Sequence, residues 1–395
     1  MDRKIFTRAV WIVSFVSLFT DIASEMLYPI MPVFLKSIGF SVVLIGILEG
    51  VAEATAGISK GYFGNLSDKV QKRVPFIRTG YLMSAVSKPM MALFVFPWWI
   101  FIARTIDRLG KGIRTSARDA LLSDESTAEN KGKVFGLHRA MDTLGAAIGP
   151  ILALLFLWKY PGNYTWLFII AFLPGIIAIS LTFLLKDRKQ NKHSDQRASK
   201  SFFSYLGYWK IAPSAYKKMV VPLLLFTVFN STDAFLLLYL KYKGFSDTQM
   251  ISFYIFYNLV YAAMSLPVGI IADKLGLKRI IAFGFLIFAV VYGTMPLANS
   301  WIIFGLLFGL YALYASATEG VSKALITNIA QKEHVATAIG FYSSFSSICA
   351  LLASSLGGII WYSFSPEAML WFSAGGSTIA ALLIMRLKIN PGYSL

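Results

Sequence analysis

The chain has 395 residues, of which 56% are apolar and 14% are charged, and its formal net charge is +17. In soluble domains roughly a quarter of the residues are charged, so this composition excludes an ordinary soluble globular protein. The basic residues gather in short gaps between apolar runs and form no stripe interleaved with aromatic residues, which argues against nucleic acid as a partner. The single cysteine, Cys349, excludes disulfides and thiolate metal sites.

Long apolar runs recur along the chain from near residue 8 to residue 385. A helix of about 20 residues crosses the hydrocarbon core of a bilayer. The first run continues past Asp21 and Glu25, which is too long for the apolar part of a signal peptide, so we interpret it as a retained transmembrane helix. The twelve predicted spans are 8–35, 42–63, 75–96, 98–118, 134–157, 165–185, 219–240, 248–270, 279–296, 300–324, 335–361 and 367–386.

Lysine and arginine are concentrated in alternate gaps between these spans. Cytoplasmic loops of membrane proteins carry such an excess. We therefore predict an inner (cytoplasmic) membrane location, with both termini and the long central loop in the cytoplasm. The loop separates an N-terminal six-helix bundle over 1–186 from a C-terminal six-helix bundle over 218–395, with a linker over 187–217.

The two predicted bundles are related by an internal repeat. The motif at 39–41 recurs at 244–246, an offset of 244 − 39 = 205, and the motif at 64–69 recurs at 269–274, again 269 − 64 = 205. A constant shift at separated places indicates two similar halves. Such repeats are typical of transporters whose halves rock around a binding site near the membrane midplane.

The gap after the second span of each half carries the pattern Gly-x-x-x-Asp-Lys followed by basic residues. Glycine allows two helices to approach closely, and an aspartate can pair with basic groups or with the N-terminus of a neighbouring helix. The pattern predicts a charged clasp that holds one conformation and opens in another. The predicted clasp residues are Gly64, Asp68, Lys69 and Arg73 in the first half and Gly269, Asp273 and Lys274 in the second.

This pattern resembles the loop motif between helices two and three of the major facilitator superfamily, although Gln71 replaces the usual second glycine. In the fifth span, the motif Gly145-Ala-Ala-Ile-Gly149-Pro150 is similar to the antiporter motif of the drug–proton antiporter branch. The resemblance covers nearly the whole chain. It implies an all-α membrane fold with twelve transmembrane helices in two pseudo-symmetric six-helix bundles, working as a monomer without a cofactor.

The fourth span is unusually rich in charge. Arg108-x-x-x-Gly112 resembles the superfamily motif around a helix-four arginine, which is associated with proton transfer in proton-coupled members. An ionisable residue at membrane depth costs a few kcal/mol, so each is a candidate for function, although buried structural pairs remain the alternative. The candidates for proton coupling or cavity lining are Asp21, Glu25, Glu49, Glu53, Lys88, Arg104, Asp107, Arg108 and Lys111.

The second half carries amides where the first carries carboxylates. By the offset of 205, Glu25 corresponds to Asn230 and Glu53 to Asn258. We infer that the first half handles protons or ionic substrate groups and that the second supplies neutral contacts. The predicted substrate-lining residues are Tyr28, Asn230, Asp233, Asn258, Tyr261 and Glu319.

These features predict a secondary active transporter of a small organic solute that works by alternating access, as proton-coupled efflux by antiport. The alternative is a proton-coupled importer of an anionic metabolite or of a metal–siderophore chelate. An intramembrane enzyme is disfavoured because the chain has only three histidines and no His-Glu-x-x-His motif, and a metal site is not expected. A receptor or structural protein would leave the midplane charges unexplained. The expected partners are a small-molecule substrate, protons and the lipid bilayer.

Overall fold

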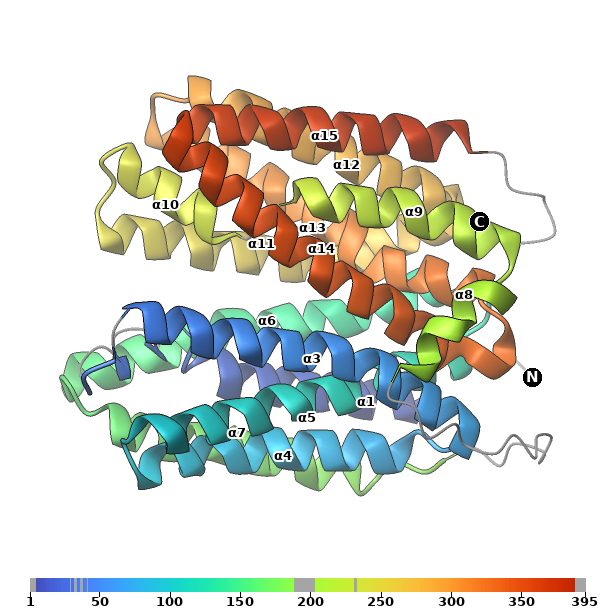
Figure 1. The fold of residues 1–395 in the computed structure, drawn as a ribbon, viewed down its shortest axis with the longest axis horizontal. Coiled ribbons are helices and arrows are strands. Elements are labelled where there is room, and N and C mark those ends of the chain that lie inside the picture. The colour runs from blue at the N-terminus through green and yellow to red at the C-terminus, as the bar shows by residue number, and fades with distance from the viewer. Residues whose placement is uncertain are drawn as a thin grey trace. The chain divides into compact units, whose positions relative to one another are not determined.

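The computed structural model describes residues 5–28, 30–31, 34–35, 38–40, 42–187, 203–230 and 233–387. Within these ranges every regular element is a helix, as the ribbon in Figure 1 shows. Residues 188–202 of the predicted linker, and the side chain of Glu49 on the second predicted span, lie outside the described residues.

The long helices of the first half correspond to the predicted spans. They are α1 (Arg8–Glu25), α3 (Val42–Val70), α4 (Val74–Leu93), α5 (Pro97–Asp124), α6 (Lys131–Lys159) and α7 (Tyr164–Thr182). The short elements η1 (Ser204–Gly207) and α8 (Tyr208–Ile211) follow. The second half contains α9 (Ser214–Phe229), α10 (Ala234–Tyr242), α11 (Asp247–Leu275), α12 (Leu277–Thr294), η2 (Met295–Leu297), α13 (Trp301–Ile329), η3 (Lys332–His334), α14 (Val335–Ser363) and α15 (Pro366–Arg386).

Two predicted spans are interrupted. In the first, α1 ends at Glu25, and the described residues Met31, Phe34 and Leu35 are helical again, with the Met31 N–H donating to the Leu27 carbonyl at 2.9 Å. The seventh span is not one continuous helix, because α9 ends at Phe229 and α10 begins at Ala234. Asn230 leaves the helical conformation with φ −90° and ψ 89°. Asparagine and aspartate compete with helical hydrogen bonds through their own side chains, so the break falls where the predicted polar residues Asn230 and Asp233 lie.

Seven described helices are long and apolar enough to cross a membrane: α6, α7, α11, α12, α13, α14 and α15. The bent pair formed by 204–211 and 214–229 adds an eighth if it counts as one span. Helices α1, α3, α4 and α5 are not among them, and these four carry the residues predicted for proton coupling. The charges of the first half therefore lower the hydropathy of the helices that bear them.

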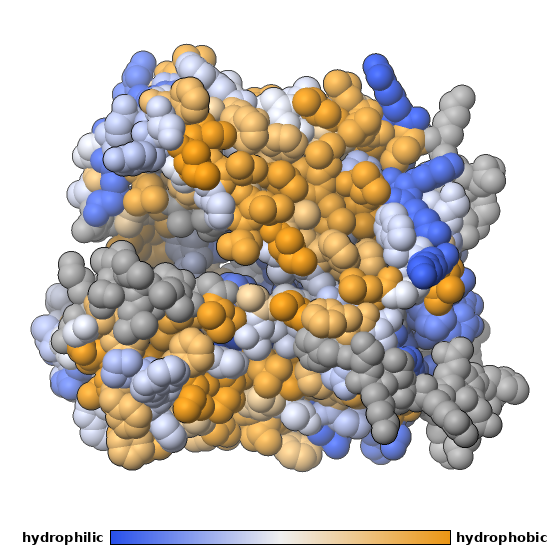
Figure 2. All heavy atoms as spheres, viewed as in Figure 1, coloured by the Kyte–Doolittle hydropathy of each residue, from blue (hydrophilic) through white to orange (hydrophobic). Residues whose placement is uncertain are grey.

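The surface of the helices is strongly apolar. Figure 2 shows broad hydrophobic areas, and many large apolar side chains are exposed. Examples are Leu155, Trp158, Leu173, Ile302, Leu351 and Phe364. Apolar patches of this extent are rare on soluble monomers, and they fit helices that face lipid.

The chain forms two compact units. Unit 1 comprises Met1–Glu125, Met141–Ile211 and Gln331–Ser344, and unit 2 comprises Ser126–Ala140, Ala212–Ala330 and Phe345–Leu395. Each unit thus takes in a short segment from the other half of the sequence. The predicted boundaries at 186 and 218 stay a prediction.

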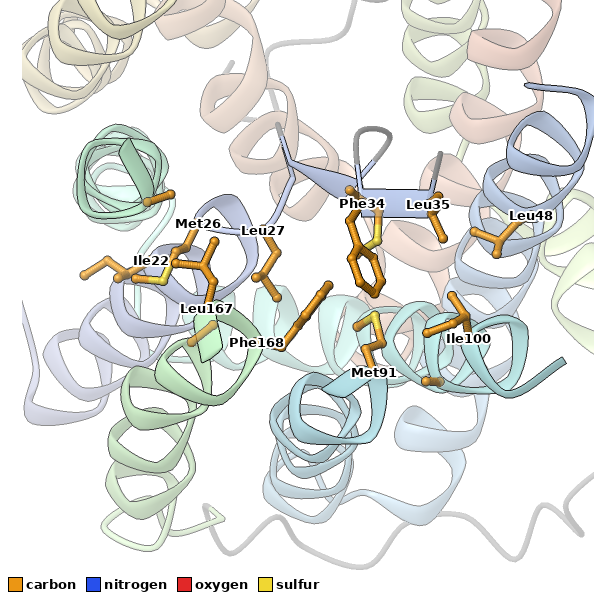
Figure 3. Close-up of a cluster of buried hydrophobic side chains, with 14 of the residues drawn as sticks. Ile22, Met26, Leu27, Phe34, Leu35, Leu48, Met91, Ile100, Leu167 and Phe168 are labelled. Atoms are coloured by element: carbon orange, nitrogen blue, oxygen red, sulfur yellow. The ribbon is translucent and has the colours of Figure 1, made fainter. Parts of the chain in front are cut away.

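A hydrophobic cluster packs α1, α4, α5 and α7 together in unit 1 (Figure 3). Met26, Phe34, Met91, Ile100 and Phe168 are all buried within it. The rings of Phe34 and Phe168 lie edge to face, with centroids 4.9 Å apart. Such aromatic pairs add to the stabilisation from apolar burial, so this cluster gives the charged helices of unit 1 a rigid frame.

Helices α4 and α5 approach each other through two glycines. A Cβ atom on Gly80 would lie 2.5 Å from the Gly110 carbonyl oxygen, and one on Gly110 would lie 2.6 Å from the Gly80 carbonyl oxygen. Backbones can approach this closely only where side chains are absent. The pair therefore fixes how near α5 lies to α4.

We expect Gly80→Ala to lower the thermal stability of the purified protein, because the added methyl group has no room. Overpacking of this kind typically costs about 1–3 kcal/mol. The matched control is Gly375→Ala on α15, where an added Cβ meets no atom within 4 Å. Thermal denaturation in detergent measures both variants, and equal melting temperatures would contradict the close approach of α4 and α5.

Candidate functional site: a buried charge cluster and two helix clasps

Helix α5 carries a row of cations on one face, because Arg104, Arg108 and Lys111 are spaced i, i+4 and i+7. Arg104 and Arg108 are buried. Asp107 neutralises part of this charge. Its carboxylate lies 2.7 Å from the Lys88 ammonium of α4 and 3.5 Å from the Arg104 guanidinium. Lys88 and Asp107 are both almost fully buried, so they form an internal ion pair that fixes α4 against α5.

Two further carboxylates meet the row of cations. Glu53 of α3 forms an ion pair with Arg108, with 3.2 Å between the carboxylate oxygen and the guanidinium nitrogen. Glu25 of α1 interacts electrostatically with Lys111, Arg108 and Arg104, and Glu53 interacts with the same three cations. The structure therefore brings most of the predicted cavity residues of unit 1 into one cluster.

Glu53 and Arg108 differ in their exposure. The Glu53 side chain is 53% exposed, whereas that of Arg108 is 10% exposed. A guanidinium presents donors in a planar fork that matches a carboxylate. The exposed Glu53 carboxylate thus contacts the buried Arg108 guanidinium, a group that is suited to bind carboxylates in general.

The ionic row continues beyond the predicted residues. The Arg114 guanidinium lies 4.6 Å from the centre of the Tyr81 ring. Arg118 pairs with Asp119 at 2.9 Å and donates a hydrogen bond to the Ser17 hydroxyl at 3.2 Å. These residues lie on α5 together with Arg104. Their position in the same charge-rich segment of the sequence could have identified them as part of the row.

Asp21 and Tyr28 fall at different places relative to α1. Asp21 lies within α1, one turn before Glu25, and interacts electrostatically with Asp142 of α6. Tyr28 lies in the turn after α1 and is 51% exposed. Tyr28 therefore does not share a face of α1 with Asp21 and Glu25, because α1 ends before it.

The predicted lining residues of the second half lie in unit 2 among tyrosines. Asp233 accepts a hydrogen bond of 2.6 Å from the Tyr311 hydroxyl. The Asn230 amide donates to the Tyr314 hydroxyl at 2.8 Å. Asn258 is buried and donates to a main-chain carbonyl of its own helix. Tyrosine hydroxyls therefore orient the polar residues at the break between α9 and α10.

Unit 2 also contains an ion pair. Arg139 of α6 lies 3.3 Å from the Glu319 carboxylate and donates a 2.5 Å hydrogen bond to the Tyr261 hydroxyl. The second half of the sequence thus contributes a charged group, Glu319, and not only neutral contacts. The arginine that Glu319 pairs with comes from the first half of the sequence, which the repeat alone does not predict.

The first predicted clasp ties α3 to the N-terminus of α14 within unit 1. The buried Asp68 carboxylate accepts hydrogen bonds from the backbone N–H groups of Ala336 and Thr337, at 3.3 and 2.6 Å. It also pairs with Arg73 at 2.6 Å. A carboxylate at a helix N-terminus satisfies free N–H groups and interacts favourably with the helix dipole. Gly64 has no side chain, and a Cβ at this position would collide with the Ala336 carbonyl oxygen.

The second clasp repeats this arrangement within unit 2. Asp273 accepts hydrogen bonds from the backbone N–H groups of Gly132 and Lys133, at 2.7 and 2.8 Å, at the N-terminus of α6. Gly269 lies against the Gly132 carbonyl. Lys274, next to Asp273, is exposed, and Lys69 is partly buried. Both predicted Asp residues therefore cap a helix from the other half of the sequence.

The turn after the first clasp keeps its shape without glycine. Gln71 has a left-handed backbone with φ 55°, and Gly276, at the corresponding position, has φ 100°. The Gln71 side chain donates a 2.6 Å hydrogen bond to the Asp68 carbonyl, which supports the turn. Burial lowers the pKa of the neighbouring Arg73, but the Asp68 and Asp124 carboxylates outweigh it, so the pKa of Arg73 is raised and the guanidinium stays charged.

The helix-five motif forms a contact between α6 and α1. A Cβ on Gly149 would lie 2.7 Å from the Met26 amide nitrogen, and one on Gly145 would lie 3.1 Å from the Asp21 Cβ. Pro150 lies inside α6 without ending it. The two glycines thus bring the backbone of α6 against α1 next to Asp21.

Apolar helices long enough to cross a membrane, internal ion pairs and two repeated helix clasps define a multi-pass helical membrane transporter. The chain belongs to the Major Facilitator Superfamily, whose model matches residues 13–260 and 250–393. It is therefore a transporter and not an enzyme.

An uncharacterised transporter of this superfamily from Methanocaldococcus jannaschii is 31% identical over 394 residues, which cover 97% of this chain and 96% of that protein. The staphyloferrin B transporter of Staphylococcus aureus is 29% identical over 150 residues, 37% of this chain and 35% of that protein. The solved structure of the human organic anion transporter TETRAN has a TM-score of 0.81 at 16% identity, and the match covers 97% of this chain and 100% of that chain. This structural likeness shows the same fold.

We expect Asp68→Asn to destabilise the protein more than Asp273→Asn, because Asp68 is buried and paired with Arg73 whereas Asp273 is partly exposed. Hydrogen bonds to charged groups contribute about 1.5–3 kcal/mol each, and Asn keeps the size of the side chain but loses its charge. Thermal denaturation of the two purified variants gives the comparison. A larger loss for Asp273→Asn would contradict this ranking.

Proposed function

We propose that the chain transports a small organic anion across the membrane and that its transport is coupled to protons. The supporting observation is the row of Arg104, Arg108 and Lys111. Among the described side chains, Glu25, Glu53 and Asp107 lie near this row. A concentration of cationic groups at membrane depth suits a ligand that brings negative charge. The fold shared with a human organic anion transporter supports the same substrate class by analogy.

Glu53 occupies the position that a substrate carboxylate would take. The Arg108 guanidinium is buried, whereas the Glu53 carboxylate that pairs with it is exposed. An incoming carboxylate would compete with Glu53 for the guanidinium nitrogen that Glu53 contacts at 3.2 Å. Substrate binding at this nitrogen therefore displaces Glu53 from it.

The sign of the coupling follows from this competition. A proton on Glu53 or Glu25 removes a negative charge that competes with the substrate, so protonation raises the affinity for the anion. By reciprocity, a bound anion raises the affinity for the proton by the same factor. Protons and anion then cross together, and an inward proton gradient drives uptake. This corresponds to the importer that the sequence offered as an alternative.

A second candidate is proton-coupled efflux by antiport, the function first predicted from the sequence. It is favoured by the Gly145 and Gly149 contact with α1, which lies beside Asp21 and matches the motif of the drug–proton antiporter branch. In that case a neutral or cationic solute displaces the proton from the carboxylates of α1. Substrate and proton then compete, and export proceeds as protons enter.

The transport cycle we propose is alternating access by a monomer in an inner (cytoplasmic) membrane, with both termini in the cytoplasm. The two clasps provide its conformational control. Asp68 and Asp273 each hold the N-terminus of a helix from the other half, so tilting of the bundles over 1–186 and 218–395 has to break and re-form these bonds.

We expect proteoliposomes to accumulate radiolabelled citrate when the outside is acidified, and Arg108→Ala to reduce this uptake at least about tenfold, since one ion pair to the substrate is worth more than about 1.4 kcal/mol. The matched control is Arg78→Ala, which removes an arginine that donates to main-chain carbonyls at the end of α7. Comparing uptake of citrate, malate and acetate shows how many carboxylates the site prefers in its substrate.

Two results would contradict anion symport. One is citrate uptake that Arg108→Ala leaves unchanged. The other is a flux of the cation tetraphenylphosphonium that runs against the proton gradient, with no citrate flux in either direction, which would establish antiport instead.

A further inference from the structure

An ion pair in unit 2 resembles the pair between Arg108 and Glu53 in unit 1. Arg139 of α6 lies 3.3 Å from the carboxylate of Glu319 on α13, and the corresponding distance between Arg108 and Glu53 is 3.2 Å. In both pairs the arginine is the less exposed partner, whereas the side chains of Glu319 and Glu53 are 47% and 53% exposed. Each compact unit therefore contains an arginine that is paired with an accessible glutamate from another helix.

Tyr261 of α11 holds the Arg139 guanidinium from a second direction. The Arg139 Nε–H donates a 2.5 Å hydrogen bond to the Tyr261 hydroxyl, and the guanidinium carbon lies 5.2 Å from the centre of the Tyr261 ring. A guanidinium this close to an aromatic ring is attracted by it. Because a phenol is uncharged at neutral pH, Tyr261 orients the guanidinium without neutralising its charge.

The frame behind Arg139 joins three helices of unit 2. Tyr261 is buried, and its main-chain carbonyl accepts a 3.4 Å hydrogen bond from the Ser316 hydroxyl, which ties α11 to α13. Gly320 packs α13 against α6, since a Cβ at this position would lie 3.2 Å from the Phe135 carbonyl oxygen. These contacts do not involve the Glu319 carboxylate. The Arg139 guanidinium therefore keeps its position when that carboxylate leaves.

An arginine fixed in this way is suited to bind a carboxylate from solution. Glu319 contacts Nη2 of the guanidinium, and Tyr261 takes Nε. A ligand carboxylate has the charge and shape of the Glu319 side-chain terminus, so it can take the place of Glu319 at Nη2 and form the same charge-assisted contact. Because the arginine is already ordered, little further entropy is lost on binding.

We propose that Arg139 is a second anion-binding residue of this transporter, that Glu319 occupies its binding position in the absence of substrate, and that Tyr261 is its positioning residue. The ligand is an organic anion that presents a carboxylate. This inference rests on the proposed transport of such an anion and adds a binding residue to it. Tyr261 and Glu319 were predicted to line the substrate site, and Arg139 gives this lining its preference for negative charge.

A structural ion pair and an exchangeable ion pair respond in opposite directions to loss of the glutamate. If the pair only holds α6 against α13, Glu319→Gln leaves Arg139 without its counter-charge and weakens the fold. It then gives no gain in binding. If Glu319 competes with the substrate, Glu319→Gln removes the competitor and raises the affinity for the anion. The sign of the change in affinity therefore distinguishes the two roles.

Binding of radiolabelled citrate to the purified full-length protein measures this sign. We expect Arg139→Gln to weaken binding about tenfold or more, and Glu319→Gln to strengthen it about threefold or more. The matched control is Arg279→Gln, an exposed arginine of unit 2 that donates to a main-chain carbonyl, and its affinity should stay within about twofold of the wild type.

Tyr261→Phe removes the hydroxyl group and keeps the ring. We expect it to weaken citrate binding in the wild-type background and to have no further effect in the Arg139→Gln background, because Tyr261 acts through Arg139. A merely structural contribution of Tyr261 would add to that of Arg139→Gln in the double variant. Additive losses therefore overturn the positioning role.

The double variant Arg139→Gln with Glu319→Gln separates binding from folding, and it should bind citrate more weakly than the wild type. Recovery of wild-type affinity in this double variant overturns the proposal, because it shows that the two charges only have to match. Weaker binding by Glu319→Gln alone overturns it as well. Unchanged binding by Arg139→Gln, with uptake still lost in Arg108→Ala, overturns this second site and leaves the proposed function standing. A wild-type protein that binds none of citrate, malate and acetate overturns both.

Discussion

The structure depends on the pairing of charges that have been removed from water. An isolated ion in a medium of low dielectric constant is so costly that it is found only with a partner or in a changed protonation state. Several cations of α4 and α5 follow this rule, since Asp107 lies between Lys88 and Arg104, Glu53 faces Arg108, and Asp119 faces Arg118. Where the partner is half exposed, as Glu53 is, the pairing is exchangeable, and an exchangeable partner is what a transporter of anions requires.

The same constraint explains the clasps. A helix N-terminus presents backbone N–H groups without partners inside the helix, and Asp68 and Asp273 supply them for α14 and α6. These contacts join elements from different halves of the sequence, which is why each compact unit includes a short segment of the other half. A clasp built on a few strong, directional bonds can open as one event, whereas a broad apolar contact of equal strength would have to slide apart.

Much of this was accessible from the sequence because it recurs or repeats. The offset of 205 residues located both clasps, and the glycine motif of the fifth span was recognised, although the helix that it contacts, α1, is known only from the structure. Three features were not accessible. The break between α9 and α10 falls at Asn230, whose side chain donates to the Tyr314 hydroxyl of another helix, and Arg139 reaches Glu319 only through the fold. Asp142 lies near Asp21, 121 residues away in the sequence (142 − 21 = 121), only because α6 packs against α1.

The most direct test of the central claim is the number of protons that the purified transporter exchanges when it binds an anion. In weakly buffered detergent solution with a pH indicator, stepwise addition of citrate should cause a net uptake of protons from the solution, because the anion releases carboxylates from Arg108 and the released groups bind protons. Net release of protons on citrate binding would show that substrate and proton compete. That result would contradict an exchangeable pairing of Glu53 with Arg108 as the basis of coupling.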